Sequence, residues 1–228
     1  MHFSRYAVYV TLPQGPLSDF GAAWLGWNAA TGERPDAPVV HGLPLPAHEI
    51  TATPRKYGLH GTIKPPFRLV GGMDFDALHD GFARFCATQA PVTLDGLALT
   101  RLGRFLALTP VGETGALSTL AARTVEALDP FRAPLTEAEL DKRRKSGLND
   151  RQEALLTRWG YPYVMDQFRF HITLSGKLDR DTAEQVRSAL LPHIEPHLPS
   201  PFTVEALTLC GEDATGYFHE LHRYALAG

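Results

Sequence analysis

The sequence has little that would place the protein among disulfide-rich, metal-binding or membrane proteins. Its 2 cysteines, Cys86 and Cys210, lie in apolar stretches without the spacing of metal ligands, so we expect buried, reduced thiols and no metal site. No run approaches the roughly 18 apolar residues of a membrane-spanning helix. The N-terminal residues lack the charged and apolar regions of a secretory leader. We therefore expect a cytoplasmic protein with no membrane partner.

A basic excess is missing as well. The chain of 228 residues has 22 Lys and Arg against 25 Asp and Glu, a net charge of −3 at pH 7. A protein that follows many phosphates of a nucleic acid usually carries a basic excess, because counterion release supplies much of its affinity. The charge balance therefore favours a small anionic phosphate ester, held by a few local cations, over a long nucleic acid. The sequence leaves the oligomeric state open.

What the sequence does contain is one kind of tripeptide that occurs twice. His60-Gly61-Thr62 and His171-Ile172-Thr173 each lie in a stretch with the alternation of a β-strand. This alternation places the histidine and the threonine of each tripeptide on one strand face and apolar side chains on the other. Each strand therefore presents an imidazole beside a hydroxyl, backed by the core.

The position of the two tripeptides gives them their specificity, because two His-x-Thr matches mean little in a chain with 10 histidines. A helical stretch follows each tripeptide and leads to a strand that starts near a proline. Pro91 and Pro201, and likewise Thr93 and Thr203, are 110 residues apart, and the two histidines are 111 apart. The tripeptides therefore hold the same place in an internal repeat.

The repeat predicts the fold class. Each unit is expected to run strand, helix, His-x-Thr strand, helix, strand, over about residues 5–103 and 104–228. We predict one bilobal domain, 1–228, of α+β class, whose two pseudosymmetric lobes are antiparallel sheets with helices on the outer face and a cleft between them. A helical insertion at about 130–164 is expected to form a cap beside this cleft.

Two histidines on opposite sides of one site suit the cleavage of a phosphodiester. In an in-line displacement one group removes a proton from the attacking water while another protonates the departing oxygen. Histidine suits both roles because its unperturbed pKa is about 6.5. Thr62 and Thr173 are placed to donate hydrogen bonds to the non-bridging phosphate oxygens. We predict His60 and His171 as the catalytic pair, without a metal or cofactor, and the sequence leaves open which of them is the base.

These motifs resemble those of a known family. His60-Gly61-Thr62-Ile63 and His171-Ile172-Thr173-Leu174 match the two motifs of the two-histidine (2H) phosphoesterase superfamily, which carries His-x-Thr/Ser in each of two pseudosymmetric lobes. The resemblance covers essentially the full length. It implies the duplicated 2H phosphoesterase or RNA ligase-like fold, and metal-independent hydrolysis or formation of cyclic or 2′-linked phosphodiesters. Arg143-Arg144 with the stretches 159–164 and 168–171 resembles, more narrowly, the branch encoded beside phosphonate-degradation genes.

The narrower resemblance implies a cyclic phosphodiesterase, a phosphoric diester hydrolase that opens 5-phosphoribosyl 1,2-cyclic phosphate in phosphonate degradation. An alternative within the superfamily is an RNA-processing 2′,3′-cyclic phosphodiesterase or 2′-5′ RNA ligase-like enzyme, against which stand the acidic balance and the lack of a basic stripe with interleaved aromatics. A non-catalytic module that binds a phosphorylated ligand is the alternative from another class. Both complete motifs disfavour it, because binding alone needs no opposed proton-transfer groups.

Further substrate-binding candidates follow from position alone. Some share the strand face of a tripeptide or precede it, and others are placed to reach in from the insertion to hold a sugar or a second phosphate. These candidates are Lys56, Tyr57, Lys64, Arg143, Arg144, Tyr163, Arg169 and Ser175. Tyr57 has the wrong strand parity for the face of His60 unless a bulge intervenes.

Overall fold

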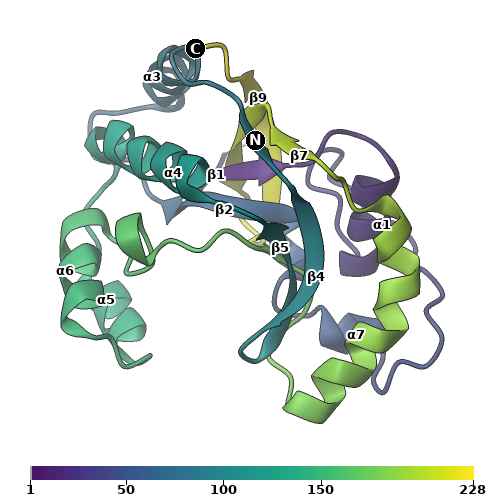
Figure 1. Ribbon diagram of the computed structural model, residues 1–228. Helices are drawn as coiled ribbons and strands as arrows, with labels where there is room; N and C mark the ends of the chain where they lie inside the picture. The colour runs from purple at the N-terminus through teal and green to yellow at the C-terminus, as the bar shows by residue number, and fades with distance from the viewer. Residues whose placement is uncertain (1) are drawn as a thin grey trace.

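Antiparallel strands form the frame of the molecule, which the computed structural model describes for residues 2–228 (Figure 1). The strands are β1 (Arg5–Thr11), β2 (His60–Phe67), β3 (Val92–Leu94), β4 (Gly96–Leu102), β5 (Phe105–Val111), β6 (Ile172–Thr173), β7 (Phe202–Val204), β8 (Ala206–Glu212) and β9 (Phe218–Ala225). A seven-stranded sheet has the order β4-β5-β6-β2-β1-β8-β9, and β3 pairs with β7 in a second sheet. Every pairing is antiparallel, so the expected α+β class is confirmed.

The pairing of equivalent strands is centred on equivalent residues. β2 and β6 carry the two tripeptides and pair at Gly61 and Ile172, the middle residue of each. β3 and β7 pair symmetrically about Thr93 and Thr203. Two antiparallel strands centred in this way are related by a local twofold axis, so the two tripeptides lie side by side and run in opposite directions.

The halves of the large sheet exchange strands, which differs from two lobes built separately from the two repeat units. β4 pairs with β5 through a tight turn at Gly103, whose φ of 57° favours glycine, while β8 pairs with β1. Each half therefore contains strands from both units, and the β2–β6 pairing joins the halves into one sheet. The repeat pattern alone does not show this exchange, because it defines the elements and not their partners.

Helices cover one face of the large sheet. They are α1 (Pro16–Leu25), α2 (Ala47–Ile50), α3 (Phe75–Cys86), α4 (Gly115–Ala127), α5 (Glu137–Arg144), α6 (Asp150–Trp159) and α7 (Arg180–Ile194), with 3₁₀ turns at Arg55–Tyr57, Asp129–Phe131, Met165–Gln167 and Glu195–His197. Side chains of α1, α3, α4 and α7 join one buried apolar cluster with alternate residues of the strands. None of the helices in residues 2–228 is long and apolar enough to cross a membrane.

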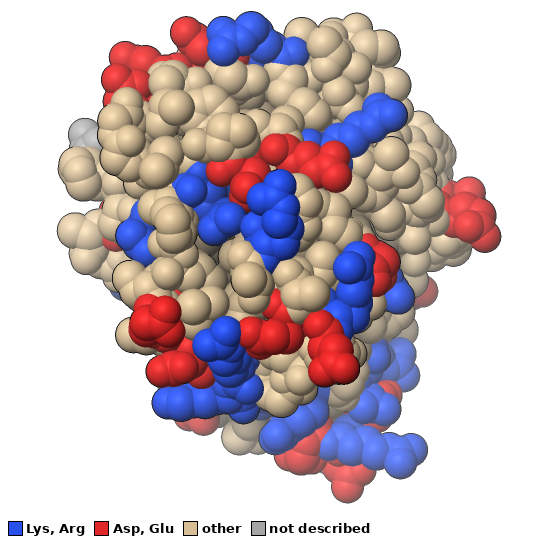
Figure 2. Space-filling model, turned by 90° about the vertical axis from the view of Figure 1, so that its left-hand side faces the viewer, with Lys and Arg blue, Asp and Glu red and all other residues tan. Residues whose placement is uncertain are grey.

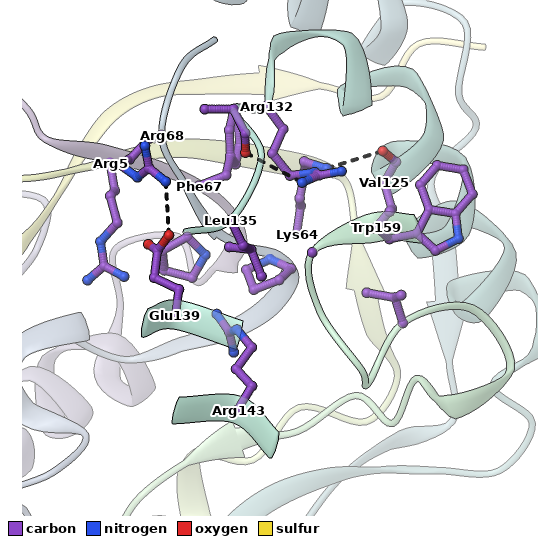
Figure 3. Close-up of a pocket in the computed structure, with 15 residues that line it drawn as sticks. Arg5, Lys64, Phe67, Arg68, Val125, Arg132, Leu135, Glu139, Arg143 and Trp159 are labelled. Carbon is purple, nitrogen blue, oxygen red and sulfur yellow. Dashed lines mark hydrogen bonds and ion pairs between the residues drawn. The ribbon is translucent and has the colours of Figure 1, made fainter. Parts of the chain in front are cut away.

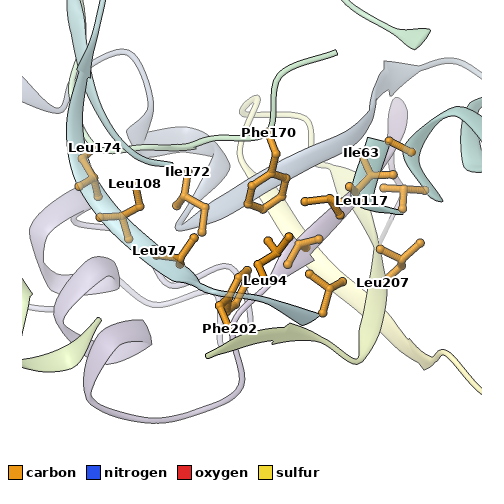
Figure 4. Packing of buried hydrophobic residues seen from close by; sticks show 14 of the residues in the cluster. Ile63, Leu94, Leu97, Leu108, Leu117, Phe170, Ile172, Leu174, Phe202 and Leu207 are labelled. Carbon is orange, nitrogen blue, oxygen red and sulfur yellow. The ribbon is translucent and has the colours of Figure 1, made fainter. Parts of the chain in front are cut away.

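The core supports both tripeptides from behind. Phe170, Ile172 and Leu174, alternate residues around the second tripeptide, are buried in the cluster (Figure 4). The alternation around the second tripeptide therefore holds as far as Leu174, although hydrogen-bonded strand pairing is confined to Ile172–Thr173. Gly61 lets the Phe170 ring pack directly against β2, because a Cβ at this position would collide with that ring. The two cysteines are buried and unpaired, as expected.

The segment between α4 and β6 contains α5 and α6, which Figure 1 shows together at one side of the molecule beside α4. Thr136 caps α5 by accepting from the Glu139 N–H, while the Glu139 carboxylate accepts from the Thr136 N–H at 2.8 Å. Leu155 of α6 packs against Val125 of α4 in a small cluster of its own. These contacts fix the insertion beside β2.

Candidate active site

Two adjoining hollows lie where β2 meets β6. The first, of about 290 Å³, is lined by His60, and the second, of about 280 Å³, is lined by His171. Thr62 lines both hollows, and Thr173 lines the first beside His60. The structure thus brings both His-x-Thr tripeptides, one from each repeat unit, to a single site.

Both imidazoles are held by the same main-chain contact. Nδ1 of His60 lies 2.9 Å from the carbonyl oxygen of Gly58, and Nδ1 of His171 lies 2.7 Å from that of Arg169. A carbonyl oxygen can only accept, so Nδ1 must donate in both rings. The lone pair of the neutral ring is then on Nε2, where in His60 it accepts from the Thr62 hydroxyl at 3.2 Å. Each histidine can therefore accept a proton at Nε2 when neutral and donate one from it when charged.

The carbonyl that holds His60 depends on a glycine. Gly58 follows the 3₁₀ turn with a φ of 70°, a region that other residues rarely adopt. A Cβ at this position would also lie 3.0 Å from the Cβ of Ala29. Gly58 was not predicted from the sequence as a site residue, although a glycine two residues before the histidine was a visible signal.

The two imidazoles differ in their surroundings. The His60 ring packs against Tyr9, with centroids 4.0 Å apart, and against Tyr57 at 5.7 Å, whereas the His171 ring lies 5.5 Å from Phe105. Burial lowers the pKa of His60 to about 4, the hydrogen bond to Gly58 opposes this shift, and the charge of His171 adds to it. His60 is therefore neutral at neutral pH.

Tyr9 lines the first hollow, and the sequence analysis did not select it. It is 1% exposed, pairs with Thr62 across β1 and β2, and within residues 2–228 its hydroxyl has no hydrogen-bond partner. Burial raises the pKa of this phenol, so it is a neutral donor. The register of β1 against β2 is what places Tyr9 on the face of His60, and a single strand pattern does not contain that information.

Tyr57 lines the first hollow, and Lys56 does not line it. Strand parity does not apply to Tyr57, because it lies in the 3₁₀ turn before β2, where its ring stacks on Phe218 at 5.1 Å. The ammonium of Lys56 lies 5.1 Å from the centroid of the Tyr57 ring. The expected parity problem for Tyr57 is therefore resolved by a turn and not by a bulge.

Lys64 and Ser175 are buried away from the hollows. A bulge in β2 pairs Lys64 with Val8 on the core face, where its ammonium donates to the carbonyl of Val125 at 3.2 Å. Burial lowers the pKa of Lys64 to about 8. The Ser175 hydroxyl accepts from the Leu106 N–H at 2.9 Å. The expectation that both residues share the face of the tripeptides is wrong for these reasons.

Tyr163 and Arg169 line the second hollow with His171. Tyr163 is 43% exposed and packs against Tyr161, with ring centroids 5.7 Å apart. The Arg169 guanidinium donates to the carbonyl of Phe168 at 2.7 Å, which holds it along the main chain. Both candidates are therefore at the site.

The structure separates the two candidate arginines of α5. Arg143 lines the first hollow, and its guanidinium lies 4.6 Å from the centroid of the Tyr161 ring. Arg144 forms an ion pair with Glu153 of α6 at 2.6 Å and lines neither hollow. Tyr161, which lines both hollows, was not among the candidates selected from the sequence.

Comparison with known proteins identifies the family. Residues 62–219 match the model of a family described as "Protein of unknown function (DUF1045)". The match extends over more than half of the chain, so this protein belongs to the DUF1045 family.

Two curated relatives bear the name ribose 1,5-bisphosphate phosphokinase PhnN. The one from Janthinobacterium sp. (strain Marseille) is 39% identical over an alignment of 232 residues that covers 99% of this chain and 51% of the relative. The one from Laribacter hongkongensis (strain HLHK9) is 36% identical over an alignment of 229 residues that covers 96% of this chain and 51% of the relative. The chain thus spans about half the length of the curated relatives it matches.

Solved structures show a weaker similarity. A protein described as a phosphoesterase is 20% identical with a TM-score of 0.46, and LigT from E. coli in its apo form is 18% identical with a TM-score of 0.47. Both comparisons cover 100% of each chain. E. coli LigT complexed with 3′-AMP gives 19% identity and a TM-score of 0.47. Because these similarities are weak, no function is inferred from them, and the proposal below depends on the geometry of the site.

Proposed function

We propose that the protein is a metal-independent phosphodiesterase of the two-histidine phosphoesterase superfamily. One observation carries the proposal. Equivalent strands bring two histidines to adjoining hollows, and each histidine is held through Nδ1 by the carbonyl two residues before it. A pair of imidazoles, each beside a threonine hydroxyl, supplies one proton acceptor and one proton donor to the same phosphorus.

The burial of His60 supports an assignment of the roles. His60 is neutral at neutral pH, so its Nε2 takes the proton of the attacking water as the water oxygen bonds to phosphorus. The bond from phosphorus to the departing sugar oxygen breaks, and His171, as the acid, donates a proton from Nε2 to that oxygen. The Thr62 hydroxyl turns from Nε2 of His60 to the substrate, and Thr62 and Thr173 donate hydrogen bonds to the non-bridging oxygens. Proton exchange with solvent then restores both rings, and no metal is needed for any of these steps.

The substrate that we propose is a small sugar cyclic phosphate, 5-phosphoribosyl 1,2-cyclic phosphate. The hollows are the size of a sugar phosphate, not of a long strand. The curated relatives are named for a ribose with phosphates at C1 and C5. Basic and acidic side chains intermingle on the face that carries α5 and α6 (Figure 2), without a continuous basic stripe there. No kinase activity is proposed for this chain, since its hollows contain paired proton-transfer groups.

Turnover of defined substrates tests the proposal. We expect the purified protein, with a chelator present, to open 5-phosphoribosyl 1,2-cyclic phosphate at least tenfold more efficiently than an oligonucleotide with a 2′,3′-cyclic end. H60A and H171A should each lower the rate by about 10²–10⁴-fold. Preference for the oligonucleotide would favour an RNA-processing enzyme. Binding without turnover that neither variant alters would indicate a non-catalytic module.

A further inference from the structure

Arg143 is a cation without an anionic partner at the edge of the first hollow. Its guanidinium lies 4.6 Å from the centroid of the Tyr161 ring, and within residues 2–228 it enters no ion pair. The adjacent Arg144, in contrast, is paired with Glu153. A cation–π contact orients the plane of a guanidinium and leaves its N–H edge free for a ligand.

The position of Arg143 is built into α5. The Glu139 carboxylate accepts from the Arg68 guanidinium at 2.9 Å, which ties the first turn of α5 to the end of β2. Arg143 follows Glu139 by four residues and therefore lies on the same face of the helix. Arg144 is one residue further round, where it meets α6. The helix thus presents one arginine to the hollow and the other to a neighbouring helix.

The surroundings of Arg143 are rich in cations. A void of about 20 Å³ adjoins the first hollow, and Arg5 and Arg143 line both spaces (Figure 3). The further cations that line the void are Lys64, Arg68 and Arg132. Glu139 is the only carboxylate among the described residues that line it, and it is bonded to Arg68. Arg5, Arg68 and Arg132 are paired with Glu212, Glu139 and Asp129, and Lys64 donates to a main-chain carbonyl. The uncompensated guanidinium of Arg143 therefore favours an anion at this end of the first hollow.

Two more donors face the same region. Arg5 uses Nε and Nη2 to pair with both carboxylate oxygens of Glu212, which leaves Nη1 for another acceptor. The Tyr9 hydroxyl is buried without a partner within residues 2–228. A buried hydroxyl without a partner is costly, and a ligand oxygen that accepts from it removes this cost.

We propose that Arg143, Arg5 and Tyr9 form a terminal-phosphate subsite, which binds a phosphomonoester that the substrate carries apart from its reacting diester. This inference rests on the proposed function and assigns the residues that bind the 5-phosphate of the proposed substrate. His171 lies in the other hollow, so the terminal phosphate is held on the side of His60, away from the leaving oxygen. Two guanidinium groups suit a phosphate dianion because they bind its oxygens through several N–H groups.

Two substrates that differ only in the terminal phosphate test the subsite: ribose 1,2-cyclic phosphate with and without a 5-phosphate. The quantity measured is the ratio of their kcat/KM values in the wild type, R143A and the control R144A. We expect the wild type to prefer the 5-phosphorylated substrate. R143A should lower this ratio by about 10–100-fold, mainly through KM, because charge-assisted hydrogen bonds to the phosphate are lost. R144A should keep the wild-type ratio.

Three results would overturn the subsite. They are a wild-type ratio near one, an unchanged ratio in R143A, and an equal fall of the ratio in R143A and R144A, which would indicate a general loss of positive charge. R143K, which retains the charge without the planar fork, should give an intermediate ratio and serves if R143A does not fold.

Turnover of neither substrate by the wild type would contradict the proposed function and leave the subsite to be tested by binding. Calorimetry then compares ribose 5-phosphate with ribose. We expect the wild type to bind ribose 5-phosphate at least about tenfold more tightly than R143A does, and ribose much more weakly. Equal affinity of the wild type and R143A for ribose 5-phosphate would refute the subsite.

Discussion

The two halves of the active site hold their histidines alike but enclose them differently. In each half a carbonyl two residues earlier fixes the imidazole through Nδ1. The neighbouring strand, however, places Tyr9 opposite Thr62 in the first half and Ala107 opposite Thr173 in the second. The tyrosine ring packs on its imidazole, and alanine has no ring to do so. Duplication thus supplies two histidines that are held in the same way, and the strand beside each of them makes their surroundings unequal.

This inequality is useful for general acid–base catalysis. A reaction that takes a proton on one side of phosphorus and gives one on the other needs two groups in different protonation states. Burial of His60 keeps that ring neutral at neutral pH. Variants that remove a feature common to both halves therefore test the shared chemistry. Variants that remove a feature of one half test the origin of the inequality.

After the histidines themselves, the threonine hydroxyls, which both halves share, should give the largest effect. We expect T62V and T173V each to lower kcat by about 10²–10³-fold, because a donor to the developing negative charge is lost while the shape is kept. T93V is the matched control, since the Thr93 hydroxyl bonds to Thr203 at 3.1 Å in the small sheet. Steady-state kinetics on the cyclic phosphate provides the measurement. Unchanged kcat in T62V and T173V would remove the hydroxyls from the phosphate site.

The residue that supplies the supporting carbonyl differs between the halves, since it is Gly58 for His60 and Arg169 for His171. A substitution of each residue tests whether Gly58 has a special role. G58A places a Cβ at a φ of 70° and against Ala29, so it should cost about 1–2 kcal/mol of stability and lower kcat by displacing His60. R169A retains the carbonyl that holds His171 and should change stability by less than about 0.5 kcal/mol. Denaturant unfolding measures both. Equal costs would mean that the backbone of Gly58 has no special role.

The buried state of His60 predicts how stability depends on pH. Its pKa is about 4 in the folded protein and about 6.5 in an unfolded chain, so the unfolded state binds the extra proton between these values. The stability that neutral His60 contributes is complete above pH 6.5 and is lost as the pH falls toward 4. We expect the free energy of unfolding of the wild type, relative to H60Q, to fall between pH 7 and pH 5. A difference in the free energy of unfolding that stays constant between pH 7 and pH 5 would contradict the lowered pKa of His60.

The smallest expected effect concerns the unpaired hydroxyl in the first half. Without ligand, Y9F should raise the free energy of unfolding by about 0.5–1 kcal/mol, because it removes a buried group without a partner. Y224F is the control of opposite sign, since the Tyr224 hydroxyl is bonded to His79 and its loss should destabilise by about 1 kcal/mol. Destabilisation of both variants to the same extent would show that the Tyr9 hydroxyl has a partner in solution.

The sequence contains enough to predict that the two His-x-Thr tripeptides belong to one site, because their equivalent places in an internal repeat are a long-range signal. It also contains the antiparallel α+β class and the Thr136 cap of α5, which depend on local patterns. It does not contain the exchange of β4 and β8, nor the register that brings Tyr9 to His60. Those features depend on which strands meet, and strand partners are a property of the whole fold.

Local backbone geometry decides which of the candidates chosen by strand parity or by chain proximity lie at the site. A bulge moves Lys64 to the core face, and a 3₁₀ turn brings Tyr57 to the hollow. Arg143 and Arg144 are indistinguishable in sequence, and only the attachment of α5 through Glu139 decides which of them faces the site. Parity counting is thus reliable only where a strand is regular.

Combining the two histidine variants tests most directly whether both repeat units act on one phosphorus atom. The measurement is the rate of cyclic phosphate opening by the wild type, H60A, H171A and the double variant. Groups that act as a unit show strongly non-additive losses, so the double variant should be about as slow as the slower single variant. Single variants that retain wild-type rates, or losses that simply multiply in the double variant, would contradict a shared reaction centre.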